Sequence, residues 1–171
     1  MKRFSKIVVS LLFTGMFVAC GVPAQQGPFD QSQSTWELMV QKKKTIHYKY
    51  TTGTSSWAGF STTTTIEVKN GTVISRSFEA FEQKNGKFVK TNSYTETGKN
   101  VGSNAEGAKA KTLKELYKEC QNDVLTKPTN KYTITFNTHK NGLIKQCTYR
   151  ESNCVDDCSQ GVSVSSIQFM P

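Results

Sequence analysis

Apolar and polar residues alternate along residues 132–136, where threonines separate Tyr132, Ile134 and Phe136. A period of two is that of a β-strand with one buried face. The pair Asn141-Gly142 follows, and Asn-Gly is the strongest short hairpin signal because a type I′ turn needs positive φ at both central residues. Counting outward from a two-residue turn sets Phe136 opposite Cys147. The pattern therefore predicts an antiparallel hairpin with one apolar face.

Two further Asn-Gly pairs, Asn70-Gly71 and Asn85-Gly86, lie between runs rich in β-branched and aromatic residues. They predict two more strand-to-strand turns. A last strand is predicted over residues 162–169. Its apolar phase shifts between Val164 and Ile167, which is typical of a β-bulge.

Two segments carry the signals of a helix start. Thr112 and Glu115 fit a capping box, and so do Ser34 and Glu37. The first pair leads into an apolar stripe at helical spacing, made of Leu113, Leu116, Tyr117, Cys120 and Val124. The second leads into a shorter apolar face, made of Trp36, Met39 and Val40. We expect one helix after each pair.

The predicted elements repeat in the order helix, strand, strand, strand, with an additional hairpin through Asn85-Gly86 in the first half. This order predicts an α+β fold of tandem α-β-β-β units. We expect a two-layer sandwich, with one antiparallel sheet of six or seven strands and two helices on one of its faces. Residues 35–171 are long enough to form a single domain with its own core.

The tandem helix-plus-three-strand order is similar to that of β-lactamase inhibitory protein and of small lipoproteins of the outer-membrane assembly machinery. Four stretches in sequence also resemble exported bacterial domains of unknown function: Trp36, Tyr48-Lys49-Tyr50, residues 66–71 (IEVKNG) and residues 112–117 (TLKELY). The resemblance implies an exported module. No catalytic residues belong to that pattern, so none are carried over.

The first residues predict export. A basic start with Lys2, Arg3 and Lys6 precedes an apolar run over residues 7–18. This run is shorter than the roughly 20 residues needed to span a bilayer, so residues 1–19 are interpreted as a signal peptide. Because Val18-Ala19-Cys20-Gly21 resembles the lipobox of bacterial lipoproteins, we expect Cys20 to be lipidated.

The alternative is ordinary cleavage after Ala24, which would release a soluble secreted protein. Both interpretations export the chain; the first anchors it to a membrane of the cell envelope, in the periplasm or at the cell surface. Residues 20–34, rich in Gln, Ser, Gly and Pro, are predicted to form a flexible tether.

The charge and the cysteines fit an exported protein. The chain has 22 basic and 13 acidic residues and a net charge of +9, which falls to +6 without the three basic residues of the signal peptide. A mildly basic surface attracts anionic lipid or cell-wall polymer, and nucleic acid is not an expected partner in this compartment.

Five cysteines are present, and assigning Cys20 to the lipid leaves an even set of four. We expect two disulfides, which pair Cys120 with Cys147 and Cys154 with Cys158. The first would join the apolar stripe of the second helix to the strand face beneath it, and the second would close a short loop. Four thiolates could instead hold zinc, but thiols are rarely kept reduced outside the cytoplasm, so no metal is expected.

Signals of catalysis are few. Neither His47 nor His139 has a Ser or Cys nucleophile in a recognisable context, and no phosphate-binding glycine loop or dinucleotide motif appears. The acidic pair Asp156-Asp157 could offer oxygens to calcium, although a tight turn closed by a disulfide is the simpler account. We expect no enzymatic activity and no cofactor.

Two segments are candidates for binding. Residues 98–110 form a long loop rich in small residues, of the kind that is either mobile or a binding loop. Trp57 and Phe60 lie in a stretch of hydroxyl residues and glycine, where they either cap the open end of the sandwich or form a contact surface. The function expected is therefore that of a non-catalytic envelope lipoprotein, a protein-binding, inhibitor or adaptor module. The alternatives are a small extracytoplasmic enzyme and a glycan-binding protein.

Overall fold

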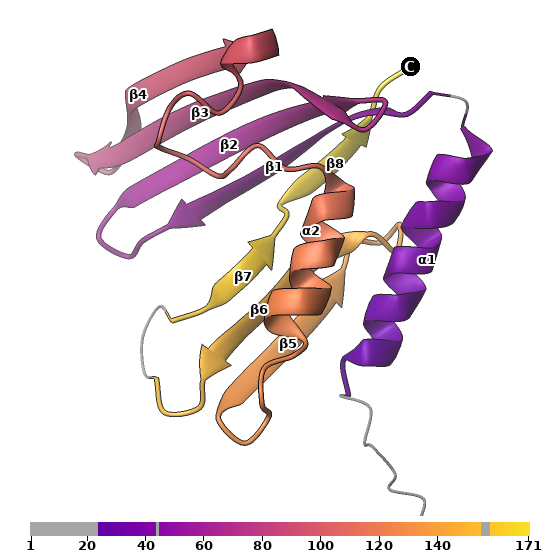
Figure 1. The fold of residues 1–171 in the computed structure, drawn as a ribbon. Coiled ribbons are helices and arrows are strands. Elements are labelled where there is room, and N and C mark those ends of the chain that lie inside the picture. Colours follow the sequence, from indigo (N-terminus) through magenta and orange to yellow (C-terminus); the bar gives the residue numbers. More distant parts are fainter. Residues whose placement is uncertain (1–23, 44, 155–157) are drawn as a thin grey trace, which may run out of the picture.

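Two antiparallel sheets and two α-helices make up the part of the chain that the structure, a computed structural model, describes: residues 24–43, 45–154 and 158–171 (Figure 1). Sheet A has the order β4-β3-β2-β1-β8, formed by β1 (His47–Ser55), β2 (Phe60–Lys69), β3 (Thr72–Lys84), β4 (Lys87–Thr97) and β8 (Ser166–Phe169). Sheet B has the order β5-β6-β7, formed by β5 (Tyr132–Thr138), β6 (Ile144–Glu151) and β7 (Gln160–Ser163). The helices are α1 (Gln26–Lys42) and α2 (Leu113–Glu119), with a 3-10 turn η1 (Gly98–Asn100) and a π-helical turn η2 (Cys120–Val124) that continues α2.

The predicted α+β class is confirmed, but the prediction of six or seven strands in one sheet is wrong. The final strand divides between the two sheets at residues 164 and 165. The N–H of Val164 donates to the carbonyl of Lys145 in β6 (2.8 Å), and the N–H of Ser165 donates to the carbonyl of Thr51 in β1 (2.7 Å). The apolar phase shift seen before Ile167 thus marks a change of sheet, because a strand that changes partners must turn its apolar side toward a different part of the core.

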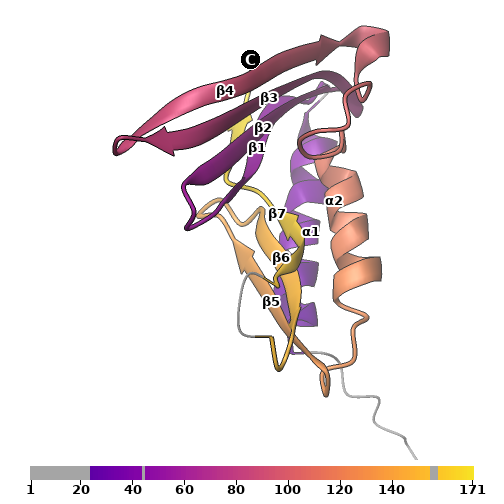
Figure 2. The ribbon, with the colours of Figure 1, turned by 90° about the vertical axis from the view of Figure 1, so that its left-hand side faces the viewer.

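Both helices lie on the same face of sheet B, and sheet A extends across the end of this layer and beyond it (Figures 1 and 2). Helix α1 packs on β5 and β6, and α2 packs on β7. The helix of the first half therefore covers strands of the second half, so the two halves share one core.

Helix α1 begins much earlier than expected. It starts at Gln26, so the prediction of a flexible tether over residues 20–34 is wrong from residue 26 onward. Phe29 is fully buried, and its ring makes edge-on contacts with the rings of Tyr117 and Phe136, at centroid distances of 6.0 and 5.7 Å. The buried residues of the helix, Phe29, Ser32 and Trp36, follow one another at intervals of three and four, which places them on one stripe.

The expected capping box at Ser34 and Glu37 is also wrong, since both residues lie inside α1. Ser32, one turn before Trp36, joins three elements through a buried hydrogen-bond network. The hydroxyls of Ser32 and Tyr117 are 2.7 Å apart, and the Tyr117 hydroxyl accepts the N–H of Ile144 in β6 (2.9 Å). A polar stretch that looks like a tether is therefore an integral part of the core.

The start of α2 is held by two tyrosines of β1. The Tyr48 hydroxyl accepts the N–H of Leu113 (2.9 Å), and the Tyr50 hydroxyl donates to the carbonyl of Lys111 (2.7 Å). Burial raises the pKa of Tyr48 to about 12 and raises that of Tyr50 further, so both hydroxyls remain protonated. The capping box predicted from Thr112 is confirmed: its hydroxyl accepts the Glu115 N–H, and its own N–H donates to the Glu115 carboxylate.

All three Asn-Gly pairs lie at strand-to-strand turns, as predicted. Asn70 and Asn85 each have a φ value of 51°. The glycine that follows each of them also has a positive φ, as a type I′ turn requires. At the third pair only Gly142 has positive φ, and the His139 N–H bonds to the carbonyl of Leu143 (2.8 Å). The two-residue turn expected there is wrong, since the loop holds one residue more.

A register shift at Asn137 and Thr138 compensates for the longer turn, so the predicted pairing of Phe136 with Cys147 is confirmed. The structure also pairs Cys120 with Cys147, at a Cα–Cα distance of 5.7 Å, and Cys154 with Cys158, at 6.3 Å. Both predicted disulfides are therefore confirmed, and the first ties η2 to β6 in the middle of the core.

Candidate functional site: the hairpin tips of sheet A

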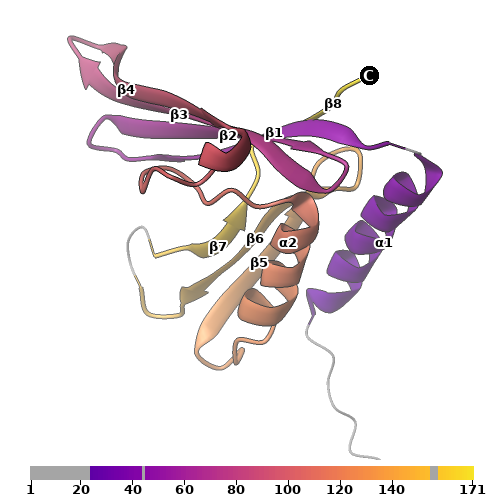
Figure 3. The same ribbon diagram turned by 45° about the horizontal axis from the view of Figure 1, so that its top comes forward.

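The free end of sheet A is formed by two hairpins that lie side by side (Figures 1 and 3). The Gln83 N–H, near the end of β3, donates to the carbonyl of Gly59 in the β1–β2 loop (2.8 Å). Gly59 has φ of 85°, and a Cβ there would come within 2.9 Å of the Gln83 Cβ. The glycine is required because it allows both the turn and the close approach of the two hairpins.

Backbone hydrogen bonds fix the β1–β2 loop. The Ser56 N–H donates to the carbonyl of Phe60 (2.8 Å), and the Gly59 N–H donates to the carbonyl of Ser56 (3.1 Å). The Ser56 hydroxyl accepts the N–H of Ala58 (3.2 Å). Trp57 therefore sits at the apex of an ordered turn, with 88% of its surface exposed. It does not cap the sandwich, so the capping role is wrong for Trp57.

Four large apolar residues, here called the tip cluster, are exposed at this end of the molecule. They are Trp57, Phe60, Phe88 and Val89. Register places Phe60 and Val89 on one face of the sheet, on either side of Glu82, because both pair with it. Phe88 pairs with Gln83 and lies on the other face. Exposed apolar residues are unremarkable when they are scattered singly, but four of them at one end of a sheet indicate an interaction site.

Phe88 and Val89 were not among the residues expected from the sequence. A signal for them was present, since two adjacent apolar residues follow the Asn85-Gly86 turn directly. In a strand, adjacent side chains point to opposite faces, so both cannot enter one core.

Charged side chains surround the tip cluster. Lys84 pairs with Glu82 (3.1 Å), and Lys90 pairs with Glu79. Lys87 is exposed and has no ion-pair partner in the part of the chain that the structure describes. Because Glu82 pairs with both Phe60 and Val89, charged groups lie between the apolar residues as well as around them.

The second candidate, the loop over residues 98–110, is held on the inner face of sheet A by a buried ion pair. Arg76 and Glu96 are each almost completely buried, with Nη1 and Oε2 3.2 Å apart. The Glu96 carboxylate accepts the N–H groups of Gly102 (2.7 Å) and Asn104 (2.6 Å). The loop is therefore pinned to sheet A at Gly102 and Asn104.

Burial alone would raise the pKa of Glu96, but these backbone donors, the Asn104 amide and the Arg76 guanidinium outweigh it and lower the pKa to about 2. Glu96 is consequently ionised at neutral and mildly acidic pH. Arg76 also donates to the carbonyl oxygens of Asn104 and Glu106 from the loop. The ion pair thus orders the loop through both of its members.

His47 lies on the outer face of sheet A. Its Nε2 is 2.7 Å from Oε1 of Glu67, and Nζ of Lys49 is 3.1 Å from the other carboxylate oxygen. Burial would raise the pKa of Glu67, but its hydrogen bonds to His47 and Lys49 lower it. The carboxylate thus balances two basic groups on one sheet face, which accounts for the cluster without a catalytic role.

The remaining candidates are not brought together. His139 lies in the β5–β6 turn, far in sequence from His47. Within the described ranges, no three His, Cys, Asp or Glu residues are placed to hold a metal ion. Cys20 and Asp156-Asp157 lie outside the described residues. No helix in the described part of the chain is both long and apolar enough to cross a membrane.

Comparison of the chain with known protein families, with curated proteins and with solved structures finds no match.

Proposed function

We propose that the protein is a non-catalytic binding module of the bacterial cell envelope that holds a partner protein through the tip cluster. The observation that carries this proposal is Trp57, 88% exposed on a hydrogen-bonded turn. Tryptophan is enriched at the energetic centres of protein interfaces, because it buries a large area at low conformational cost. A fixed turn adds to this advantage, since little flexibility is lost on binding.

The compartment follows in part from the disulfides, which form and persist in oxidising, extracytoplasmic environments. We propose further that lipidated Cys20 anchors the chain to a membrane. Helix α1 begins six residues after Cys20, and the hairpin tips lie far from that end of the helix (Figures 1 and 2). An anchor there would leave the tip cluster facing away from its own membrane.

Lipidation of Cys20 predicts the mass of the mature protein. We expect the intact mass, measured on protein purified from its native host, to equal that of a chain starting at Cys20 plus attached acyl groups. A mature chain that starts at Gln25 would contradict the anchor and leave a soluble secreted protein.

Truncation of Trp57 should remove binding without loss of stability. Because the indole is almost fully exposed, we expect Trp57→Ala to shift the midpoint of thermal unfolding by no more than about 1–2 °C. Affinity for the partner should fall by roughly 30-fold or more, as for a central interface tryptophan. The partner can be found with a photo-cross-linking amino acid at position 57 in living cells. Its affinity for wild-type protein and Trp57→Ala would then be measured with purified components.

The matched control carries the same cross-linker at Leu38, which is exposed as well (53%) but lies on α1. We expect one envelope protein to be captured from position 57 and not from position 38. Identical products from both positions, or an unchanged affinity of Trp57→Ala, would exclude the tip cluster as the binding surface.

A further inference from the structure

Strand β7 is the end strand of sheet B, and one of its two edges is not used in the sheet. The Val164 N–H bonds to the carbonyl of Lys145, and Ser163 lies opposite Gln146. In an antiparallel pair, hydrogen-bonded and non-hydrogen-bonded positions alternate. The main-chain N–H and C=O of Ser163 therefore point away from β6, toward the open edge.

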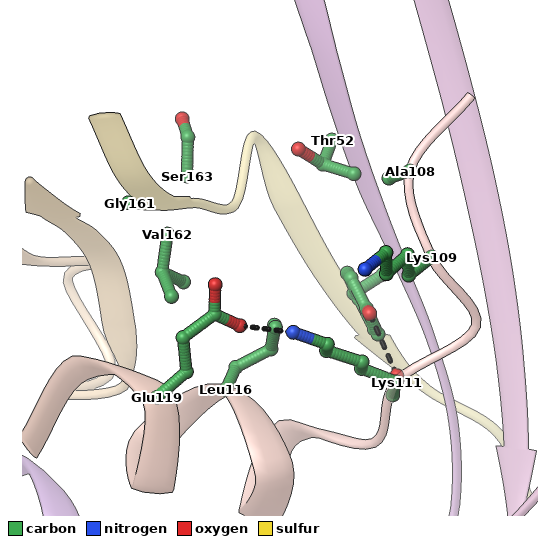
Figure 4. Close-up of a pocket in the computed structure, with 10 residues that line it drawn as sticks. Thr52, Ala108, Lys109, Lys111, Leu116, Glu119, Gly161, Val162 and Ser163 are labelled. Atoms are coloured by element: carbon green, nitrogen blue, oxygen red, sulfur yellow. Dashed lines mark hydrogen bonds and ion pairs between the residues drawn. The ribbon is translucent and has the colours of Figure 1, made fainter. Parts of the chain in front are cut away.

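A groove of about 250 Å³ runs beside this edge (Figure 4). It lies in the angle between the two sheets, with β7 on one side, the residues leading into α2 on the other, and Thr52 of β1 above them. Leu116 and Val162 supply apolar surface. The edge of β7 therefore opens into a hollow with an apolar floor, and no other strand of the described residues covers it.

The positive and negative charges that line the groove do not balance. Lys111 is neutralised by Glu119, with Nζ and Oε2 2.6 Å apart. Lys109 also lines the groove, is exposed, and has no ion-pair partner within the described ranges. One positive charge thus remains uncompensated beside the open strand edge.

We propose that this groove binds an extended segment of a partner protein by strand addition to β7, with an Asp or Glu side chain of that segment paired to Lys109. An added strand would satisfy the outward N–H and C=O of Ser163, and open edges are the usual template for such pairing. Its alternate side chains would face the apolar surface of Leu116. The carboxylate would supply the charge that Lys109 lacks.

This site is separate from the tip cluster. Trp57 lies five residues beyond Thr52, about 17 Å along an extended strand. The proposal therefore goes beyond the function proposed above, and the two can fail independently.

The probe is a displayed library of random heptapeptides, selected on the full mature protein. We expect the selected peptides to share an acidic residue, and the affinity of one of them is then measured on four variants. Ser163→Pro removes an N–H that sheet B does not use, and Ser163→Ala keeps it. Lys109→Glu reverses the unpaired charge, and Lys140→Glu makes the same change in the β5–β6 turn.

Ser163→Pro and Lys109→Glu should each weaken binding about tenfold or more, which corresponds to the loss of one hydrogen bond or ion pair. The two controls should stay within about twofold of wild type. In wild-type protein, the peptide should also slow hydrogen exchange at the Ser163 amide, a readout that does not depend on the folding of the proline variant.

Failure to select any peptide would overturn the proposal, as would peptides that bind without slowing exchange at Ser163. Selection of peptides without acidic residues, or equal binding by Lys109→Glu and Lys140→Glu, would remove the role of the charge. If the protein instead self-associates through β7, the segment that occupies the groove belongs to a second copy of this chain and not to a partner protein. Trp57→Ala should leave peptide affinity unchanged, so a failure here does not affect the tip cluster.

Discussion

Phe29→Ala should lower the free energy of unfolding by about 3–5 kcal/mol, the range found when a buried phenylalanine is truncated. The ring is fully buried between residues of α2 and β5, Tyr117 and Phe136. Its removal leaves a cavity that the surrounding rings can fill only in part. The measurement is denaturant unfolding of the mature protein, monitored by far-UV circular dichroism.

The control for this prediction is Leu38→Ala on the same helix. Leu38 is 53% exposed, so its truncation should cost less than about 1 kcal/mol. If Phe29→Ala costs no more than Leu38→Ala, the first turns of α1 do not belong to the core. The segment from residue 26 would then be the flexible tether that its composition suggests.

Removing the Cys120–Cys147 disulfide, with both residues changed to alanine, should destabilise the protein by about 3–4 kcal/mol. The bond closes a loop with a sequence separation of 27, and this range is the chain-entropy estimate for a loop of that length. Both cysteines are fully buried, so the lost sulfur atoms also leave unfilled space. Thermal and denaturant unfolding of the variant, compared with wild-type protein, measure the effect.

The second disulfide provides the comparison. Cys154 and Cys158 are separated by only four residues in sequence, for which the same relation gives about 2 kcal/mol. We therefore expect the double alanine variant at these positions to be the more stable of the two. The reverse order would show that the cross-link between η2 and β6 does not hold the core together.

The two halves of the chain cannot be separated as independent units. Ser32 of α1 contacts the Tyr117 hydroxyl of α2, and that hydroxyl receives the Ile144 N–H from β6. Trp36, on the same helix, meets Tyr48 of β1 edge-on at 5.4 Å. Helix α1 is therefore one of the elements that join the two sheets, together with α2 and the chain from β7 to β8.

Several features of the protein were determined by the sequence alone, because they depend on interactions within a few residues. Asn70-Gly71 and Asn85-Gly86 form their turns because both positions accept positive φ. The Thr112 capping box depends on residues three apart. One long-range feature, the Cys120–Cys147 pairing, could also be predicted, because a helical stripe and a strand face, each set by local periodicity, had to meet.

Tertiary structure alone decided the division into two sheets, the start of α1 and the surface that is left exposed. The chain leaves sheet B at Val164 because Thr51 of β1 offers a new backbone partner. The apolar phase shift before Ile167 indicates an irregularity there, but it does not identify the new partner. Phe29 is buried because Tyr117 and Phe136, both distant in sequence, meet it. Trp57 is exposed because sheet A extends beyond the helices (Figure 2), and no local pattern reports where the covering layer ends.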